Sequence, residues 1–349
     1  MSNPLELLST LAHLYAPYPT LAEIEATAAR LQGKVLSTPV WPWQAGELPG
    51  RLRPGTEVWL KLELFQLTGT FKLRGALNSI LQLDQPARAR GVVAASAGNH
   101  AMAVAYAARV AGVSARLAMP AGASPARVEA CRAWGAQVEL LPDVHAAFAR
   151  ADALVEEEGR TMVHPYDGPL IAQGTGTVGL ELMRQVASLD AVVVPVGGGG
   201  LAAGIAAAVK QINPACRVYG VEPEGADAMT RSFEAGSPQR LERVQTIADS
   251  LGAPYALPYS FGVCRRFVDA MVRVSDDALR AAMHALYRDV KLATEPATAA
   301  STAALLGPLR EELGGKRVAL IVCGSNLDAP TFARHLRDAE ARAQAVQDA

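Results

Sequence analysis

The chain has 349 residues, half of them apolar, which is enough to bury one large core or two closely joined ones. Its 33 Lys and Arg residues nearly balance its 34 Asp and Glu residues, so charge gives no reason to expect nucleic acid or a membrane surface as a partner. The four cysteines are widely spaced and histidine is scarce, which argues against a disulfide framework and a zinc site. The N-terminus carries Glu6 instead of a basic and then apolar segment, and we expect a cytoplasmic protein that acts on a small molecule.

The N-terminal part of the chain carries one clear helix signal and one clear strand signal. A helix is predicted from Thr20 to Gly33, because Glu23 stands three residues after Thr20 and completes a capping box. Residues 57–63 alternate between apolar and polar side chains, which predicts a strand. This strand leads into the segment 68–76, so Lys72 is expected at a strand-to-helix transition.

Strand and helix signals alternate through the middle of the chain. Strands are predicted at 92–95, 115–119 and 137–141. Helices are predicted after Asn99, after a cap at Ser124 with Pro125 in the first turn, and over roughly 145–157. Such alternation is typical of a parallel sheet covered by helices. His164–Asp167 then breaks the pattern.

A second α/β stretch follows this break. Its predicted strands are 191–196, 217–221 and 317–322, and its predicted helices lie around 178–186, after Gly200, from Ser275 to about 290 and at the C-terminus. Residues 222–270 are rich in turn formers and carry no clear assignment. The chain is therefore predicted to form two sheets that share one cleft.

The glycine run Gly197–Gly200 stands between a predicted buried strand and a predicted helix. Glycines there let other groups approach the backbone closely, and free amides together with the helix dipole favour a phosphate. A plain flexible turn is the alternative, although four successive glycines cost more entropy than a turn requires. The run is interpreted as a phosphate site.

Lys72 is a candidate for covalent chemistry. Most lysines are solvated surface residues, but a partly apolar pocket lowers the pKa of an amine, and imine formation with an aldehyde requires a neutral amine. Arg74 is interpreted as a structural ion-pair partner.

The segment Ser96–His100 also joins a strand to a helix, so its backbone amides predict an anion site suited to a carboxylate. Asn99 adds a side-chain donor. The alternative, an asparagine cap beside a surface histidine, stays open for this motif alone. His100 by itself does not indicate acid–base chemistry.

Gly174–Gly179 matches the glycine pattern of nicotinamide-cofactor sites. No clear strand precedes it and no acidic residue is well placed after it, which argues against a dinucleotide site. A glycine-rich entry to a helix is the favoured interpretation.

Six segments of the sequence together resemble one known family in order and spacing. They are Thr70–Ala76, Ser96–His100, Gly197–Gly200, Gly220–Glu224, Thr246–Asp249 and Cys323–Asn326. In these segments the chain resembles the fold-type II pyridoxal-phosphate enzymes, and among them the threonine and serine dehydratase group, which includes serine racemases. The resemblance covers about residues 20–330.

This resemblance implies an α/β fold like that of tryptophan synthase β, with two three-layer domains and mostly parallel sheets. Residues 1–90 and 167–349 would form the large cofactor-binding domain, and residues 91–166 a small α/β domain inserted within it. Pyridoxal 5'-phosphate would lie in the cleft between the two domains.

The same resemblance implies roles for single residues. Lys72 would hold the cofactor as an imine and later act as base, and Phe71 would pack against the cofactor ring. Asn99 would hydrogen-bond the phenolic oxygen. Cys323 would face the pyridine nitrogen, unless it is only a small buried apolar residue. The phosphate loop would comprise Gly197, Gly198, Gly199, Gly200 and the amide of Leu201, and the substrate loop would comprise Ser96, Ala97, Gly98, Asn99 and His100.

The implied reaction removes water and ammonia from a β-hydroxy amino acid such as L-threonine or L-serine and leaves a 2-oxo acid. A thiol at Cys323 would hold the ring nitrogen only weakly protonated, which favours prompt β-elimination over long-lived carbanions. Ala97 stands where racemases of this group have a second serine, so racemisation is not expected. Glu295 either neighbours the substrate or is only a charge at a helix start.

Other family features carry over in part. The divalent-cation site of the group would use Glu222, the carbonyl of Ala226 and an aspartate at 228, but residue 228 is Ala, so no metal is expected. A homodimer or homotetramer is implied. Two alternatives stay open: a β-replacement synthase or threonine synthase of the same fold, and a non-catalytic cofactor-binding or regulatory protein on this scaffold.

Overall fold

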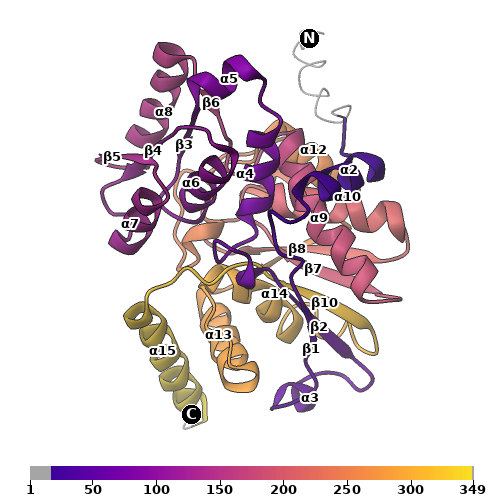
Figure 1. Cartoon of the computed structure of the whole chain (residues 1–349). Coiled ribbons are helices and arrows are strands. Elements are labelled where there is room, and N and C mark those ends of the chain that lie inside the picture. The colour runs from indigo at the N-terminus through magenta and orange to yellow at the C-terminus, as the bar shows by residue number, and fades with distance from the viewer. Residues whose placement is uncertain (1–16, 348–349) are drawn as a thin grey trace, which may run out of the picture.

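The computed structural model describes residues 17–347 and contains two sheets (Figure 1). In spatial order the larger sheet contains β1 (Val40–Pro42), β2 (Glu57–Leu62), β10 (Arg317–Val322), β7 (Ala191–Pro195), β8 (Arg217–Pro223) and β9 (Ala270–Val274). Only the edge strand β1 is antiparallel to its neighbour, and the other pairs in this sheet are parallel.

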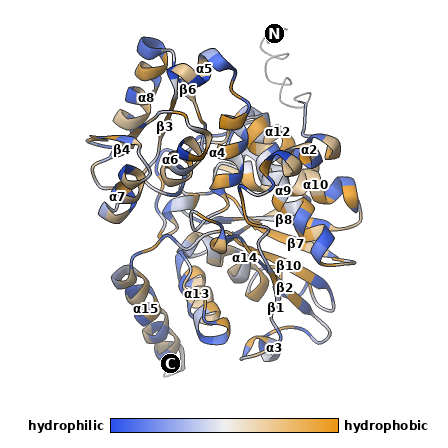
Figure 2. Ribbon diagram, in the orientation of Figure 1, coloured by the Kyte–Doolittle hydropathy of each residue, from blue (hydrophilic) through white to orange (hydrophobic). Residues whose placement is uncertain are grey.

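Helices cover both faces of this sheet. Ala191 and Val193 of β7 belong to the core shared with α13 (Asp276–Val290) and α14 (Pro296–Leu306). Val192 and Val194 belong to the opposite core, which is shared with α9 (Pro169–Gln185), α10 (Gly200–Ile212) and α12 (Pro258–Phe267). Successive strand residues point to opposite faces, and both faces are covered, which explains why β7 is apolar throughout. Figure 2 shows β7 and its neighbours β8 and β10 as mostly hydrophobic.

The smaller sheet repeats this three-layer design. It contains β5 (Gln137–Leu141), β4 (Ala115–Pro120), β3 (Val92–Ala95) and β6 (Thr161–Met162), all parallel. Val92 and Ala94 pack with α4 (Lys72–Leu81), α6 (Asn99–Ala111) and α7 (Pro125–Ala133), whereas Val93 and Ala95 pack with α8 (Val144–Glu158). The predicted α/β class with two mostly parallel sheets is confirmed.

The remaining helices are peripheral or short. They are α2 (Leu21–Leu31), α3 (Leu48–Arg51), α5 (Gln85–Arg90), α11 (Ala228–Ala235), α15 (Ala329–Gln347) and two 3₁₀ turns, η2 (Glu63–Phe65) and η3 (Asp249–Leu251). The division of the chain after residues 90 and 166 stays a prediction. Helix α4 lies at this division, since it packs both on α6 above the small sheet and on α9 of the larger unit.

Several local predictions are confirmed. Thr20 caps α2, and Glu23 completes the capping box. Ser275 caps α13 by accepting a hydrogen bond from the amide of Ala278. Ser124 occupies the N-cap position of α7, but its side chain accepts no hydrogen bond there, so the predicted side-chain cap is wrong.

The predicted role of Gly174–Gly179 is wrong. These residues lie inside α9, not at its entry. A Cβ at Gly174 would come within 2.6 Å of the carbonyl oxygen of Arg74, and one at Gly179 within 2.9 Å of that of Ile205. The glycines are therefore needed because α4 and α10 pack closely against α9.

A buried ion-pair network fixes the start of α4. Arg74 is fully buried, and its guanidinium donates to Glu63 at 2.8 Å and to Glu181 at 2.7 Å. A buried guanidinium is tolerated only when such partners satisfy it. Arg74 is therefore the structural ion-pair partner that was predicted, and its network lies two residues from Lys72.

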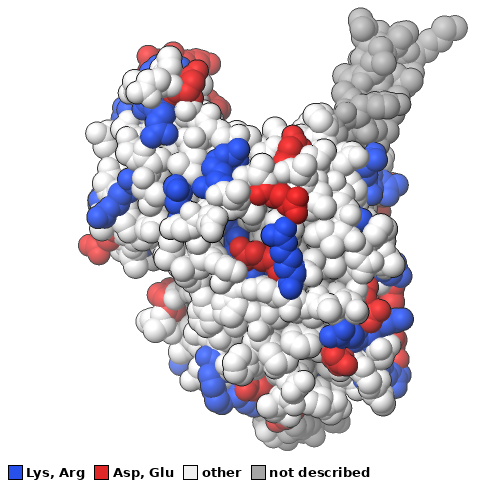
Figure 3. All heavy atoms as spheres, turned by 45° about the vertical axis from the view of Figure 1, so that its right-hand side comes forward, with Lys and Arg blue, Asp and Glu red and all other residues white. Residues whose placement is uncertain are grey.

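The surface carries charges of both signs. On the face shown in Figure 3, basic and acidic side chains lie next to one another and form no large region of one sign. Among the described residues, no helix is both long and apolar enough to cross a membrane. The N-terminal segment with Glu6 lies outside the described residues.

Candidate active site

One cavity of about 230 Å³ brings the predicted site residues together. Three of its walls follow the C-terminal ends of parallel strands: 96–100 follows β3, 197–201 follows β7, and Cys323 follows β10. Ligands of open α/β sheets bind at such strand ends. Every residue predicted for the cofactor and the substrate lines this cavity.

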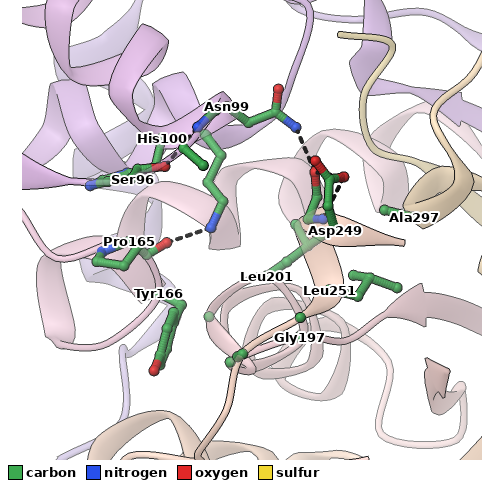
Figure 4. A pocket seen from close by; sticks show the side chains of 18 of the residues that line it. Ser96, Asn99, His100, Pro165, Tyr166, Gly197, Leu201, Asp249, Leu251 and Ala297 are labelled. Atoms are coloured by element: carbon green, nitrogen blue, oxygen red, sulfur yellow. Dashed lines mark hydrogen bonds between the residues drawn. The ribbon is translucent and has the colours of Figure 1, made fainter. Parts of the chain in front are cut away.

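Lys72 is the first residue of α4, and its amine is buried inside the cavity. Nζ donates a hydrogen bond to the carbonyl oxygen of Pro165 at 2.5 Å, which is the dashed line that ends on Pro165 in Figure 4. Nζ lies 5.2 Å from the centroid of the Phe71 ring. Burial lowers the pKa of Lys72 to about 8, although Cys323 and Glu295 partly oppose this shift. A substantial fraction of the amine is therefore neutral near physiological pH, as nucleophilic and base chemistry requires.

The glycine loop presents unpartnered amides. Within residues 17–347, the backbone amides of residues 198–201 have no hydrogen-bond acceptor. They stand at the N-terminus of α10, where the helix dipole also favours an anion. Gly199 adopts a φ of +90°, a conformation that side chains disfavour. The loop is therefore suited to a phosphate.

Close packing is a second reason for glycine in this loop, and the sequence did not indicate it. A Cβ at Gly198 would come within 2.2 Å of the Tyr166 ring, and a Cβ at Gly200 within 2.2 Å of the Tyr166 carbonyl oxygen. The segment that carries Pro165 and Tyr166 therefore touches both the glycine loop and Lys72. It couples the two halves of the site.

Asn99 contacts a buried glutamate. Its Nδ2 donates to Glu295 at 2.9 and 3.1 Å and to Ser250 at 3.2 Å, and its Oδ1 accepts from Asn326 at 2.7 Å. Asn99 is already the first residue of α6, and no side chain caps that helix, so the alternative of an asparagine cap is wrong. The partners fix the amide of Asn99 at the cavity wall.

Glu295 precedes α14 at its N-cap position, but its carboxylate serves the site and not the helix. Burial, reinforced by the charge of Asp249, raises the pKa of Glu295 to about 7. Of the two interpretations given to this residue, a neighbour of the site fits its contacts better than a mere charge at a helix start.

His100 is buried, so the alternative of a surface histidine is wrong. Its Nε2 lies 2.7 Å from the carbonyl oxygen of Val163. Burial and the charge of Lys72 lower the pKa of His100 to about 3, so the ring is neutral. It ties the substrate loop to the end of the small sheet.

Cys323 is a buried neutral thiol. Its Sγ lies 3.3 Å from Oγ1 of Thr298. The Thr298 hydroxyl also donates to the carbonyl oxygen of Gly324 and accepts from the amide of Gly324. Burial raises the pKa of Cys323 to about 12. The group can offer a ring nitrogen a weak hydrogen bond, but no negative charge.

Two acidic side chains near the place of the family's cation site, Glu222 and Asp227, which precedes position 228, are engaged elsewhere. Glu222 accepts hydrogen bonds from the amides of Met229 and Thr230 at the start of α11. Asp227 pairs with Arg231 at 2.8 Å and with Arg273 at 3.2 Å. Among the described residues, no group of three or more His, Cys, Asp or Glu side chains could hold a metal ion.

Sequence reasoning missed three contributors to the site. The Pro165 carbonyl is a backbone group, so only the break in the strand and helix pattern at 164–167 pointed to it. Tyr166 lay in the same segment. Arg127, on α7, pairs with Asp249 at 3.2 Å and donates to the carbonyl oxygen of Asn326, which links the small sheet to the large one across the cavity. No local pattern indicates that contact.

The residues present fit pyridoxal phosphate. The cavity offers a buried amine with a lowered pKa for an aldehyde and a row of unpartnered amides at a helix N-terminus for a phosphate. Both lie in one cavity, and a neutral thiol and an aromatic ring complete its walls.

Comparisons with known proteins agree with this fit. The family described as pyridoxal-phosphate dependent enzyme matches residues 32–324. A phenylserine dehydratase of Ralstonia pickettii is 53% identical over 318 residues, which cover 91% of this chain and 96% of that protein. An L-threonine ammonia-lyase of Thermotoga maritima is 40% identical over 275 residues, covering 78% and 68% of the two chains.

A solved structure, that of maize serine racemase, superposes with a TM-score of 0.85 at 33% identity and covers 94% of this chain and 100% of that one. Both the sequence relatives and the shared architecture thus agree with the family resemblance read from the six segments. The chain belongs to the family of pyridoxal-phosphate dependent enzymes.

Proposed function

We propose that this protein removes water and ammonia from a β-hydroxy amino acid and releases a 2-oxo acid. The observation that carries the proposal is the Lys72 amine, which is buried, has a lowered pKa and shares one cavity with the unpartnered amides of the glycine loop. Two relatives, named as a dehydratase and an ammonia-lyase, support the same class of reaction.

The residues assigned to the cofactor are those predicted for it. The amides of residues 197–201 would hold the phosphate, Lys72 the aldehyde carbon, and Phe71 one side of the ring. Asn99 would meet the phenolic oxygen and Cys323 the ring nitrogen. Bound pyridoxal phosphate supplies an electron-withdrawing ring that makes the α-proton of an amino acid acidic.

Lys72 handles the proton in this proposal. A neutral amine accepts the proton from the substrate Cα, and the carbonyl of Pro165 orients the resulting ammonium. The substrate carboxylate would be held by the amides of Ser96–His100, with the Arg127 guanidinium nearby. Because Asn99 and Arg127 are each fixed by partners, the substrate meets a preorganised wall.

The bond changes balance without an oxidant. The Cα–H bond and the Cβ–OH bond break, and water leaves. The enamine then takes up water and loses ammonia, so the net products are a 2-oxo acid and ammonia.

Ala97 supports elimination over racemisation. A racemase needs a proton donor and acceptor on each face of Cα, and a methyl group on the substrate loop can do neither. The Tyr166 hydroxyl also lines the cavity, but burial raises its pKa, and it already donates to the carbonyl of Tyr255.

The proposal extends to assembly and location. We propose a homodimer or homotetramer, supported by the exposed apolar side chains of Trp41, Phe65 and Leu67. We also propose a location in the cytoplasm, where the four free cysteines would stay reduced. Sedimentation of the purified protein tests the assembly.

The test of the reaction follows 2-oxo acid and ammonia together from purified, cofactor-loaded protein. Equimolar release from a β-hydroxy amino acid without a second substrate is the expected result. Turnover only with an added nucleophile or a phosphorylated substrate would instead indicate a β-replacement synthase or threonine synthase. Bound cofactor without any turnover would indicate a protein that only binds it.

A further inference from the structure

A second cavity, of about 700 Å³, adjoins the active-site cavity. Its lining and that of the first cavity share five residues: Val144, Phe148, Gly252, Pro254 and Tyr255. The two cavities are therefore adjacent. We call the region between them, which these five residues line, the apolar neck.

The neck differs chemically from the rest of the active site. The other walls carry Lys72, the substrate loop, the glycine loop and the Arg127–Asp249 ion pair. These groups account for the amine, carboxylate and phosphate of a bound complex. The neck offers the aromatic rings of Phe148 and Tyr255 and the aliphatic surfaces of Val144 and Pro254, and none of its five residues is charged.

Both sides of the neck are anchored. Phe148 and Val144 belong to α8, and Phe148 packs at the edge of the core that α8 forms with β3 and β4. On the other side, Tyr255 accepts a hydrogen bond from the Tyr166 hydroxyl at its carbonyl oxygen, and Pro254 accepts one from the amide of Leu241. A substituent that enters the neck would meet surfaces already fixed in place.

We infer that the apolar neck is the subsite for the substituent on Cβ of the substrate, and that this enzyme prefers an aromatic substituent over a methyl group or hydrogen. This inference rests on the proposed function for the reaction that the substrate undergoes. The lining of the subsite is observed in the structure and is independent of that proposal. An aromatic ring covers the Phe148 and Tyr255 surfaces and gains from aromatic packing, whereas a methyl group leaves them in water.

Val144 is a position in the neck that can be substituted without disturbing the fold. Its side chain is 45% exposed at the first turn of α8, so a polar replacement there does not disturb a core. Phe148 is more buried, and shortening it removes the aromatic surface itself. Leu140, 48% exposed on β5 and outside both cavities, is the matched control.

The experiment compares kcat/KM for L-threo-phenylserine and L-threonine. We expect the wild-type ratio to favour phenylserine by about tenfold to a hundredfold, the range typical of an apolar pocket that accepts or lacks a substituent. Phe148→Ala should lower the ratio roughly tenfold and Val144→Ser roughly threefold. Leu140→Ala should leave it unchanged.

A binding measurement separates this inference from the proposed reaction. L-Phenylalanine and L-alanine have no β-hydroxyl to lose, so their affinities, followed by the visible absorbance of the holoenzyme, report the subsite alone. We expect L-phenylalanine to bind at least about tenfold more tightly, and Phe148→Ala to remove this difference.

Three outcomes decide the inference. Equal affinities of the two amino acids, or a ratio unchanged in both Phe148→Ala and Val144→Ser, would overturn the subsite even if threonine is turned over. Selective binding of L-phenylalanine, together with no release of a 2-oxo acid from phenylserine or threonine, would support the subsite and overturn the proposed reaction.

Discussion

The inner wall of the active site and the apolar neck are built in opposite ways. The inner wall comprises Lys72, the glycine loop, Glu295 and Cys323. Glu295, Cys323 and most of the glycine loop are buried and Lys72 is partly buried, and the side-chain polar groups of this wall are held by defined partners. The neck is half-exposed and bonded to its surroundings through backbone carbonyls. This difference suggests a division of work, in which the inner wall determines which reaction occurs and the neck determines which substrate enters.

Removal of the amine should have the largest effect on the inner wall. Lys72→Ala should lower kcat by about 10²-fold to 10⁴-fold or more on every substrate, because general-base catalysis is lost together with the group that binds the aldehyde. Steady-state kinetics and circular dichroism check this. Lys34→Ala, at an exposed position, is the control. If Lys72→Ala lowered kcat for only one of the substrates, the inner wall would also determine substrate choice, which contradicts the proposed division of work.

A methyl group on the glycine loop should have the next largest effect, on stability and on cofactor affinity. In Gly200→Ala the new Cβ would come within 2.2 Å of the Tyr166 carbonyl oxygen, so we expect a loss of about 1–3 kcal/mol in the free energy of unfolding. Cofactor affinity should fall with it. Chemical unfolding and a pyridoxal phosphate titration measure the two effects.

Gly122→Ala is the matched control for that change, because a Cβ there meets no atom within 4 Å. It should alter neither quantity. If both variants behave alike, close packing of Tyr166 is not the reason for the glycine at 200.

The buried carboxyl of Glu295 should make stability depend on pH. Burial raises its folded-state pKa to about 7, above the value of about 4.3 for a free carboxyl, so the folded state binds this proton more tightly. Its contribution therefore favours folding at low pH and is lost as the pH rises from about 4 to 7.

Glu295→Gln removes this contribution while Glu222, whose pKa burial also raises, is the same in both proteins. From pH 5 to pH 8, the free energy of unfolding of the variant should rise relative to wild type by about 2–3 kcal/mol. Urea unfolding at several pH values measures it, with Glu129→Gln, an exposed position, as control. A flat difference would mean that the carboxyl is not desolvated.

The smallest effect expected on the inner wall is that of Cys323→Ser. A hydroxyl is also neutral and can keep the contact with Thr298, so kcat should stay within about tenfold of wild type and stability should fall by about 1 kcal/mol. Kinetics and thermal unfolding test this. A loss as large as that of Lys72→Ala would show that the thiol has a role that a hydroxyl cannot replace.

Lys72 and the glycine loop of the inner wall could be predicted from the sequence because their signals are local, whereas Cys323 was assigned only through the family resemblance and the role of Glu295 stayed open. The glycine run and the lysine segment each stand at the join of a strand and a helix, where composition and element order indicate their use. The chain resembles a known family in those same segments. Their joint placement in one cavity was inferred from that resemblance and is found in the structure.

Other features of the fold and of the site could not be predicted from the sequence, for physical reasons. Helix α14 is buried almost all round, so it has no amphipathic period to detect. Gly174–Gly179 matches the glycine pattern of a dinucleotide site, but close packing of three helices requires the same glycines. The neck joins α8 to a loop more than a hundred residues later in the chain, and only the tertiary fold brings Phe148 and Tyr255 together.

The central claim is that Lys72 holds the cofactor. The most direct test is to reduce the holoenzyme with borohydride, which fixes the cofactor to the amine it is bound to, and to locate the added group by mass spectrometry of the digest. The account predicts the phosphopyridoxyl group on the peptide that contains Lys72, and none in Lys72→Ala. A group on another lysine, such as Lys61, or no fixed group on fully loaded protein, would contradict it.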